Sequence, residues 1–581
     1  MATTTALPLE PATPERELSV PRPRRRRPGV ATAMLAVYLL LAVALLAGTW
    51  LAAEPSWAGV DADAPLFAWY LRWTPFAVTH GHSPLFTDYL HFPDGANLMW
   101  NTSIPLPALV MWPVTALLGP LVAYNALATL ALALSAWCAF LAIRRYTTST
   151  VAAAVGGLLY GFSPYMLMQA RGHLHLSIAV LPPLLLLIAD EMLIRQRVSS
   201  RVLGAALGVL VAAQLLIGEE LVAAGALVGA IGVALLALLN PSEVRRRAPH
   251  AARVLGVAVL VAVVLSAYPL GVQFLGPQRV GGLLQPRDTF VADLTSFVVP
   301  NDVELLPVLG RFPALDSAPY VGIPLLLLLA VSLVVLRRHR VVVLATLLGL
   351  VVAVLSMGPR LHLGGRPTSI HLPWRVVGGL PLMENVLPIR LMVFTYLLIG
   401  VVIAVLLGRA LGARSRRWRG AGVLAVVVAL LPLLPALPFP STPARVPAFF
   451  TGAAVTRIPE GSSVLVTPYY ELRPMLWQAE AGMRYRTRQG GVFTPGPYFN
   501  APTSPLSSEL AALDGGLAAP PATLSEAQRA PYLEALAAGR VGTVVVGPSP
   551  GSAGLARFFE VLLGRPPEVT GGVAVWWDVH P

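Results

Sequence analysis

Eleven apolar segments, separated by short Arg-rich connections, constrain this chain more than any other feature of its sequence. Most of them approach the roughly 20 residues that an α-helix needs to cross a bilayer. The chain is 56% hydrophobic and only 12% charged, whereas a soluble protein carries about 25% charged residues. The sequence therefore predicts a polytopic, all-α membrane protein. The predicted spans are 30–52, 121–143, 151–168, 176–194, 202–217, 221–239, 251–271, 319–336, 341–357, 391–408 and 420–438.

The placement of Arg predicts how these spans are oriented. The chain has no Lys, so its basic residues are all Arg. Basic connections stay in the cytoplasm, and Arg24–Arg27 precede the first span, which is too long for a cleaved signal peptide. If the spans alternate in direction from a cytoplasmic N-terminus, all the remaining dense Arg clusters also lie in the cytoplasm, and the C-terminal region lies outside. Those clusters are Arg144–Arg145, Arg195/Arg197/Arg201, Arg245–Arg247, Arg337–Arg338/Arg340 and Arg409–Arg419.

The remaining segments complete the predicted organisation. Residues 1–29 are rich in Pro and Arg and predict a disordered cytoplasmic tail, and 30–440 form the membrane domain. Segment 104–118 carries three Pro, which interrupt helical hydrogen bonding. It is expected to be a half-inserted or surface helix within the first outer loop, 53–120.

The last part of the chain, 441–581, changes character. Short β-like runs occur at 462–469, 541–547 and 571–579, with helix-like stretches near 505–514 and 525–538. Strands that alternate with helices are typical of α/β units. The sequence therefore predicts a small extracytoplasmic α/β domain.

Charge and cysteine content exclude other classes. A formal net charge of +13 could indicate a nucleic-acid binder, but the Arg clusters lie between apolar spans and are explained by membrane orientation. The single Cys, Cys138, lies inside an apolar span, which excludes an intramolecular disulfide and a Cys metal cluster.

The first outer loop holds an unusual concentration of polar residues, with four Asp between 59 and 103. Asp61 and Asp63 follow the first span and precede a stretch, 64–80, whose pattern predicts an amphipathic helix at the membrane surface. An acid held there could act as a general base on a lipid-phosphate substrate. The alternative is a solvated loop. Asp88 is a weaker candidate, and Asp94 lies in a PDG turn signal and is expected to be structural.

A second pair of acids, Glu219 and Glu220, interrupts a long apolar run at an outer helix hairpin. Carboxylates near the membrane indicate function by default, and a tight interfacial turn is the equally weighted alternative. Adjacent acids also repel, which would raise one pKa and favour proton transfer.

Histidines and arginines in the outer loops suggest anion or metal binding. The loop RGHLH contains Arg171, His173 and His175. The two His could ligate a divalent metal if His82 or His91 completed the site, or they could bind phosphate together with Arg171.

Three other outer Arg, namely Arg279, Arg287 and Arg390, are not explained by orientation. They could hold a donor phosphate. The alternatives are lipid-headgroup contacts and an ion pair with Glu384.

These features resemble a known class. The stretches WYLRWTPFAVTHGHSPLFTDYLHFPDGANLMWNTS and LLYGFSPYMLMQARGHLHL resemble actinobacterial membrane proteins described as glycosyltransferase-like, and ENVLPIRL resembles YfhO-like membrane proteins. Together with the topology, 30–440 resembles the GT-C class of membrane glycosyltransferases. The resemblance implies a polyprenyl-phosphate sugar as donor, and Asp63, with Asp61 second, as the catalytic acid. The second outer loop lacks the acid that many members have there, unless Glu219 or Glu220 substitutes.

The predicted function is therefore an inverting transfer of a sugar to an envelope glycan, lipid or protein acceptor at the outer face of the cytoplasmic membrane. Asp63 would take the acceptor proton, and Arg279, Arg287, Arg390 or Arg171 would hold the donor phosphate. The α/β domain would help to bind an acceptor, and no nucleic-acid partner is expected. Two alternatives stay open: a transporter or flippase for a lipid-linked glycan, and a non-catalytic envelope assembly protein.

Overall fold

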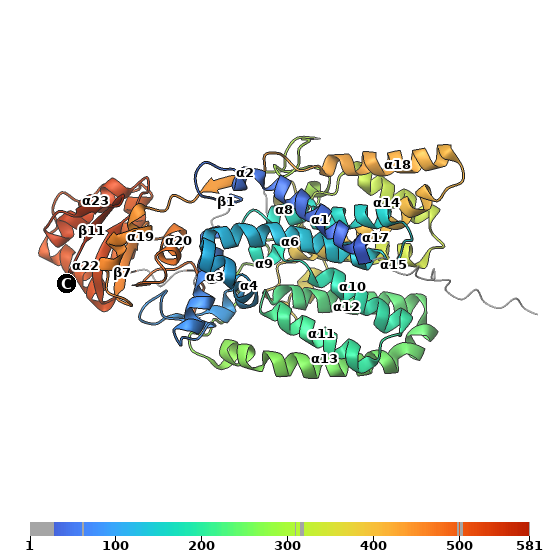
Figure 1. Cartoon of the computed structure of the whole chain (residues 1–581), viewed down its shortest axis with the longest axis horizontal. Helices are drawn as coiled ribbons and strands as arrows, with labels where there is room; N and C mark the ends of the chain where they lie inside the picture. The colour runs from blue at the N-terminus through green and yellow to red at the C-terminus, as the bar shows by residue number, and fades with distance from the viewer. Residues whose placement is uncertain are drawn as a thin grey trace, which may run out of the picture.

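A helix coincides with each of the eleven predicted apolar spans (Figure 1). The computed structural model describes residues 28–60, 63–307, 309–313, 319–496, 499 and 504–579, so most of the predicted N-terminal tail lies outside the described residues. The helices are α1 (Pro28–Leu45), α6 (Pro120–Ile143), α7 (Thr150–Gly161), α10 (Leu181–Asp190), α11 (Ser200–Leu215), α12 (Glu220–Leu239), α13 (Pro241–Leu275), α14 (Ile323–Val335), α15 (Arg340–Ser356), α17 (Met392–Leu411) and α18 (Arg416–Leu430).

Five helical segments of the described chain are long and apolar enough to cross a membrane. They are Pro120–Ile143, Leu174–Arg195, Glu220–Leu239, Pro241–Leu275 and Pro388–Leu411. Other apolar helices, including α7, α11, α14 and α15, are shorter. The chain is therefore a helical membrane protein, as the sequence predicts, and the count of eleven spans stays a prediction.

The centre of the helical part is packed through small residues. A Cβ built on Gly156 of α7 would lie 2.8 Å from the carbonyl oxygen of Gly400 in α17, and the reverse distance is also 2.8 Å. Side chains would not fit here, so the two backbones touch, as is typical of helix pairs in membranes. Most of α17 is buried by its neighbours. The Tyr38 hydroxyl of α1 donates to the carbonyl of Ala154, 2.8 Å away, and ties α1 to α7.

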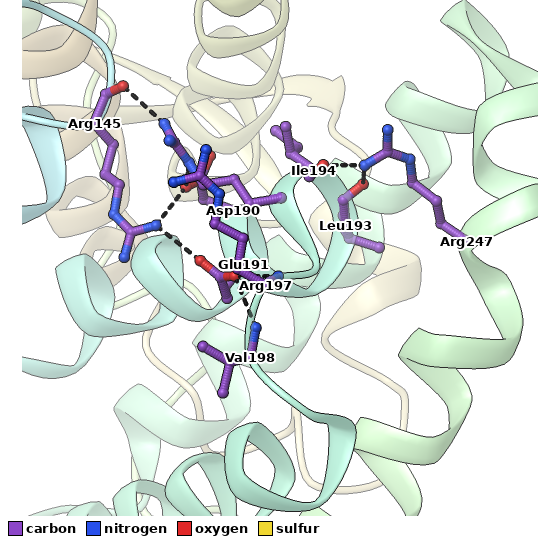
Figure 2. Close-up of polar contacts among 9 residues, drawn as sticks. Arg145, Asp190, Glu191, Leu193, Ile194, Arg197, Val198 and Arg247 are labelled. Carbon is purple, nitrogen blue, oxygen red and sulfur yellow. Dashed lines mark hydrogen bonds and ion pairs between the residues drawn. The ribbon is translucent and has the colours of Figure 1, made fainter. Parts of the chain in front are cut away.

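Three of the predicted cytoplasmic Arg clusters lie together at the end of α6 that is remote from Pro120 (Figure 2). Arg145 binds both Asp190, at 3.1 Å, and Glu191, at 3.0 Å. Both acids are buried, and Arg195 also binds Asp190, at 2.6 Å. Arg247 of α13 donates to carbonyls in η2 (Glu191–Arg195), a π-helical end of α10. These cations therefore hold helix ends together as well as bearing charge.

The first outer loop folds against the helical part rather than lying on the membrane as a separate helix. Its main helix, α3 (Ala64–Thr79), buries most of its side chains, including Trp69 and Trp73. The predicted exposed polar face is absent from this helix because α6 and three short helices pack around it. Segment 104–118 forms two helices, each too short to cross a bilayer. The short helices are α4 (Pro105–Val110), α5 (Trp112–Leu118) and α20 (Arg473–Glu480).

The C-terminal region contains a five-stranded mixed sheet in the order β10-β11-β9-β7-β8. Strand β7 is parallel to both of its neighbours, β8 and β9. Strand β11 is antiparallel to the central strand β9 and to the edge strand β10. The predicted β-like runs coincide with β7, β9 and β11. The strands are β7 (Ser463–Thr467), β8 (Arg486–Thr487), β9 (Val541–Val546), β10 (Glu568–Thr570) and β11 (Val573–Trp576), and the accompanying helices are α21 (Pro505–Asp514), α22 (Glu526–Ala538) and α23 (Ser552–Leu563).

Several contacts join this region to the first loop, and α20 lies beside α3 (Figure 1). Strand β1 (Ser56–Ala58) pairs antiparallel with β6 (Ser441–Pro443). The indole of Trp69 in α3 donates to the amide oxygen of Gln478 in α20, at 2.6 Å. The amide nitrogen of Gln478 then donates to the carbonyls of Tyr89 and Tyr485. The sheet is thereby attached to the loop that carries Asp63.

Candidate functional site

The first and second outer loops meet at a glycine. Gly59 has φ +97°, and a Cβ built on it would lie 1.9 Å from the carbonyl oxygen of Arg171. Only glycine tolerates both this backbone conformation and this approach. The backbone of Gly59 also bonds to Pro440. These contacts place the RGHLH segment directly against the residues that precede Asp63.

Asp63 lies at the N-terminus of α3, where its carbonyl accepts the backbone N–H of Phe67. Its carboxylate Oδ2 lies 3.7 Å from Nε2 of His173, and the two side chains are 35% and 19% exposed. The positive end of the helix dipole favours a carboxylate at this position. The Asp63 carboxylate therefore has an imidazole beside it and still reaches solvent, as a general base requires.

His175, the other histidine of this segment, is buried rather than presented to solvent. Its ring stacks on Phe67, with centroids 5.4 Å apart, and a Cβ built on Gly218 would lie 3.4 Å from Cδ2 of the same ring. His173 and His175 are perpendicular, with ring centroids 6.5 Å apart. This geometry directs the two imidazoles to different surroundings.

Among the described residues, the predicted ligands do not assemble a site for a divalent metal. Within the described part of the chain, no three His, Cys, Asp or Glu side chains converge as ligands. Metal sites need three or four such ligands. His175 faces Phe67, and Glu220 is held by Arg390. The residues that the sequence suggested as ligands, His173 and His175, therefore belong to separate environments.

Glu220 and Arg390 form a largely buried ion pair between the outer ends of α12 and η5 (Pro388–Leu391). The other carboxylate oxygen of Glu220 accepts the backbone N–H of Leu387, at 2.7 Å. The partner of Arg390 is therefore Glu220 and not Glu384, because the chain folds α12 against η5. Arg390 also interacts electrostatically with Asp63, so the pair belongs to the surroundings of that carboxylate.

The adjacent acid, Glu219, has a different partner. Its Oε2 accepts a hydrogen bond from Gln273 of α13, at 2.9 Å, while Oε1 is buried. Burial raises the pKa of Glu219 to about 7. The sequence attributed such a shift to repulsion between Glu219 and Glu220, but Arg390 neutralises Glu220, and desolvation is the larger cause here.

The remaining predicted phosphate ligands are dispersed. Arg171 is buried, and its Nη1 binds Asp302 at 2.9 Å. Arg279 is exposed and donates to the carbonyl of Phe274. Arg287 is exposed and lines a separate cleft. Arg390, by contrast, is largely buried, and its charge interacts with Asp63.

Of the other three Asp of the first loop, one forms an ion pair, one lies in a turn, and one lies outside the described residues. Asp61 lies outside the described residues. Asp88 is 3.3 Å from Arg486 of β8. Asp94 is exposed in a turn in which Gly95 N–H bonds to the carbonyl of His91, as the PDG signal predicts.

Sequence reasoning missed two partners of the site, Gln273 and Asp302. Gln273 interrupts the apolar pattern of α13 in PLGVQFL, and a polar residue in such a run is the kind of signal that marks a functional or structural contact. Asp302 lies in VVPNDVEL, between two apolar stretches. No local pattern predicts that Gln273 bonds to Glu219 or that Asp302 pairs with Arg171, because the members of each pair are distant in sequence.

The fold resembles that of solved GT-C glycosyltransferases. Arabinofuranosyltransferase AftD from Mycobacteria matches with a TM-score of 0.53 and 16% identity, covering 96% of this chain. This chain spans 40% of the length of AftD. The oligosaccharyltransferase of Archaeoglobus fulgidus matches with a TM-score of 0.49 and 12% identity, covering 93% of this chain and 71% of that one.

At the level of sequence, the chain matches no curated protein. One family profile, described as "Domain of unknown function (DUF6311)", matches residues 30–431. This range contains the helical part, the first outer loop with Asp63, the RGHLH segment and the Glu220–Arg390 pair. The chain belongs to the DUF6311 family.

Proposed function

We propose that this protein is an inverting glycosyltransferase that uses a polyprenyl-phosphate sugar and acts at the outer face of the cytoplasmic membrane. The observation that carries the proposal is the approach of Asp63 to His173, at 3.7 Å, with the charge of Arg390 acting on the same carboxylate. An accessible acid can act as the base in such a transfer, and a cation can stabilise the departing phosphate. The fold shared with AftD supports this choice.

Asp63 is the general base in this mechanism. Its carboxylate accepts the proton of an acceptor hydroxyl as the hydroxyl oxygen attacks the anomeric carbon of the donor. The new C–O bond forms on the face opposite the phosphate, and the bond from the anomeric carbon to the phosphate oxygen breaks. The electron pair leaves with the lipid phosphate, and the configuration at the anomeric carbon inverts. His173 orients the Asp63 carboxylate.

Arg390 is the favoured phosphate ligand. A guanidinium has five N–H donors, so Arg390 can keep Glu220 and bind a phosphate oxygen at the same time. Its charge stabilises the negative charge that the departing phosphate gains. Arg171, which binds Asp302, and the exposed Arg279 and Arg287 remain the alternative phosphate ligands.

The predicted topology favours a lipid-linked donor. A cytoplasmic N-terminus followed by the eleven predicted spans would put the Asp63 loop and 441–581 outside, where nucleotide sugars are absent. A donor carried by a lipid is then required. The α/β region contacts the first loop through Trp69 and Gln478, which suits a role in binding an envelope glycan, lipid or protein acceptor. The finer resemblance to actinobacterial and YfhO-like proteins stays a prediction.

The test is transfer by purified protein in lipid nanodiscs. A panel of polyprenyl-phosphate pentose and hexose donors is supplied with glycan acceptors, and release of polyprenyl phosphate is followed by mass spectrometry. Asp63→Asn is expected to lower turnover by about 100-fold or more, the usual contribution of a general base. Asp94→Asn, in the exposed turn of the same loop, is the matched control and keeps wild-type turnover. Undiminished turnover by folded Asp63→Asn would refute the mechanism.

A further inference from the structure

A basic cleft lies apart from the Asp63 site. It has a volume of about 390 Å³ and is lined by Pro286, Arg287, Asp288, Pro359, Arg360, His371 and Arg375. Arg360 and His371 are partners across the hairpin of β4 (Arg360–Leu363) and β5 (Arg366–His371). Arg375 follows in α16 (Trp374–Val377). The lining shares no residue with the group formed by Asp63, His173, Glu220 and Arg390.

The cleft carries an excess of positive charge. Asp288 is the one acid in its lining, and it lies 3.8 Å from Arg360. Within the described residues, Arg287 and Arg375 have no carboxylate partner. Two unpaired guanidiniums that face one opening suit an anion with several oxygens, because the fork of each guanidinium matches phosphate geometry.

Exposed apolar side chains lie on the same segments as the cleft residues and on the turn that follows them. Val376 and Leu382 are each 74% exposed, and Leu363, Ile370 and Leu380 are each at least half exposed. These residues belong to the β4–β5 hairpin, to α16 and to the turn after it. Apolar side chains gathered beside a basic surface are typical of segments that lie in the membrane interface. A phospholipid is therefore a ligand whose chemistry suits this surface.

We propose that the cleft binds the phosphate of an anionic membrane phospholipid. This lipid stays bound to the protein and is not the sugar donor. Arg287, Arg360 and Arg375 hold the phosphate oxygens, and His371 lines the same opening. The acyl chains lie against Val376 and Leu382. The bound lipid fixes segment 358–384 on the bilayer. This segment leads into η5, which carries Arg390. The inference requires a membrane but not the proposed transfer activity.

The test measures lipid binding to the full chain by native mass spectrometry after detergent exchange. Phosphatidylglycerol and phosphatidylcholine are titrated separately, and phosphatidylglycerol is expected to bind more tightly. The double variant R287Q/R375Q is expected to weaken phosphatidylglycerol binding about five- to tenfold, as the loss of two partly exposed charge-assisted contacts predicts. The control is Arg366→Gln, an exposed Arg on the same hairpin outside the cleft, which keeps wild-type binding.

Competition distinguishes the sources of phosphate. Inorganic phosphate at equal concentration is expected not to displace phosphatidylglycerol, because it lacks acyl chains for Val376 and Leu382. Displacement by inorganic phosphate would show a free-anion site and overturn the proposal. Tighter binding of polyprenyl phosphate than of phosphatidylglycerol, lost in R287Q/R375Q, would overturn it by assigning the cleft to the donor. Equal phosphatidylglycerol binding by wild type and R287Q/R375Q would also overturn it. Asp63→Asn leaves lipid binding unchanged, so failure here is separable from failure of the transferase proposal.

Discussion

The Asp63 carboxylate lies 3.7 Å from Nε2 of His173, and this contact joins the first outer loop to the second. The contact depends on Gly59, whose backbone touches Arg171 two residues before His173. The acid of this pair comes from the first loop and the imidazole from the second. Asp63 thereby has an imidazole as its neighbour, whereas Asp88 has the guanidinium of Arg486.

Replacing His173 tests whether it orients Asp63. His173→Gln keeps a polar side chain but removes the imidazole, and we expect kcat to fall about tenfold with KM for the donor little changed. The pH–rate profile is expected to shift, because a neighbour with a titratable charge is lost. Turnover is measured across the pH range in the nanodisc assay. His80→Gln, an exposed His in the first loop, serves as control, and an identical profile for both variants would contradict the role.

Glu219 is expected to make stability depend on pH. Burial raises the pKa of Glu219 from its usual 4.5 to about 7. The folded protein then holds a proton that the unfolded chain has released, so stability falls as the pH rises through this window. Glu219→Gln keeps the hydrogen bond with Gln273 and removes the titration. Between about pH 4.5 and 7, the free energy of unfolding of Glu219→Gln is expected to fall less than that of wild type, and the difference reaches up to about 3 kcal/mol.

Thermal unfolding in one detergent, at several pH values across that window, measures this difference. Glu304 contributes in the same direction, because burial raises its pKa to about 7 as well. Glu219→Gln therefore removes only part of the dependence of stability on pH. Glu460→Gln changes an exposed carboxylate and should follow wild type. A Glu219→Gln curve as steep as wild type would rule out this contribution.

Gln478 is expected to be the main polar connection between the sheet region and the first loop. It is fully buried and bonds to the indole of Trp69 and to the carbonyls of Tyr89 and Tyr485. Gln478→Leu leaves these groups buried without partners, which costs about 3 kcal/mol. The melting temperature should fall accordingly.

The control for this change is Gln528→Ala, at the exposed capping box of α22, which should cost about 1 kcal/mol. Tryptophan fluorescence adds a second readout, because Trp69 stacks on Trp73 beside the Gln478 contact. Equal losses of stability in the two variants would show that the buried hydrogen bonds of Gln478 contribute no more than an exposed helix cap.

Arg145 is expected to stabilise the opposite end of the helices. It binds two buried acids, Asp190 and Glu191. Arg145→Gln leaves these carboxylates short of a cation, and breaking a buried pair in this way costs about 3 kcal/mol. Arg246→Gln breaks an exposed pair with Glu243 and is expected to cost less than about 1 kcal/mol. Melting temperatures of both variants provide the comparison, and similar shifts would contradict a special role for the buried network.

Local patterns were sufficient to locate most elements. Apolar length predicted a helix at every one of the eleven segments, and β-like alternation located β7, β9 and β11. Apolar length could not show that α3 is buried, because its aromatic residues suit both a membrane surface and a protein core. The packing of α4, α5, α6 and α20 around α3 decides between these environments.

The sequence by itself determined a helical membrane protein with acids gathered in one loop, because hydropathy and charge act through local composition. The tertiary structure decided which acid has which partner. Glu219 and Glu220 are neighbours in the chain, yet one bonds to Gln273 and the other pairs with Arg390. Asp63 meets His173 because Gly59 allows two backbones to touch. Such pairings depend on contacts between distant segments, and no local pattern encodes them.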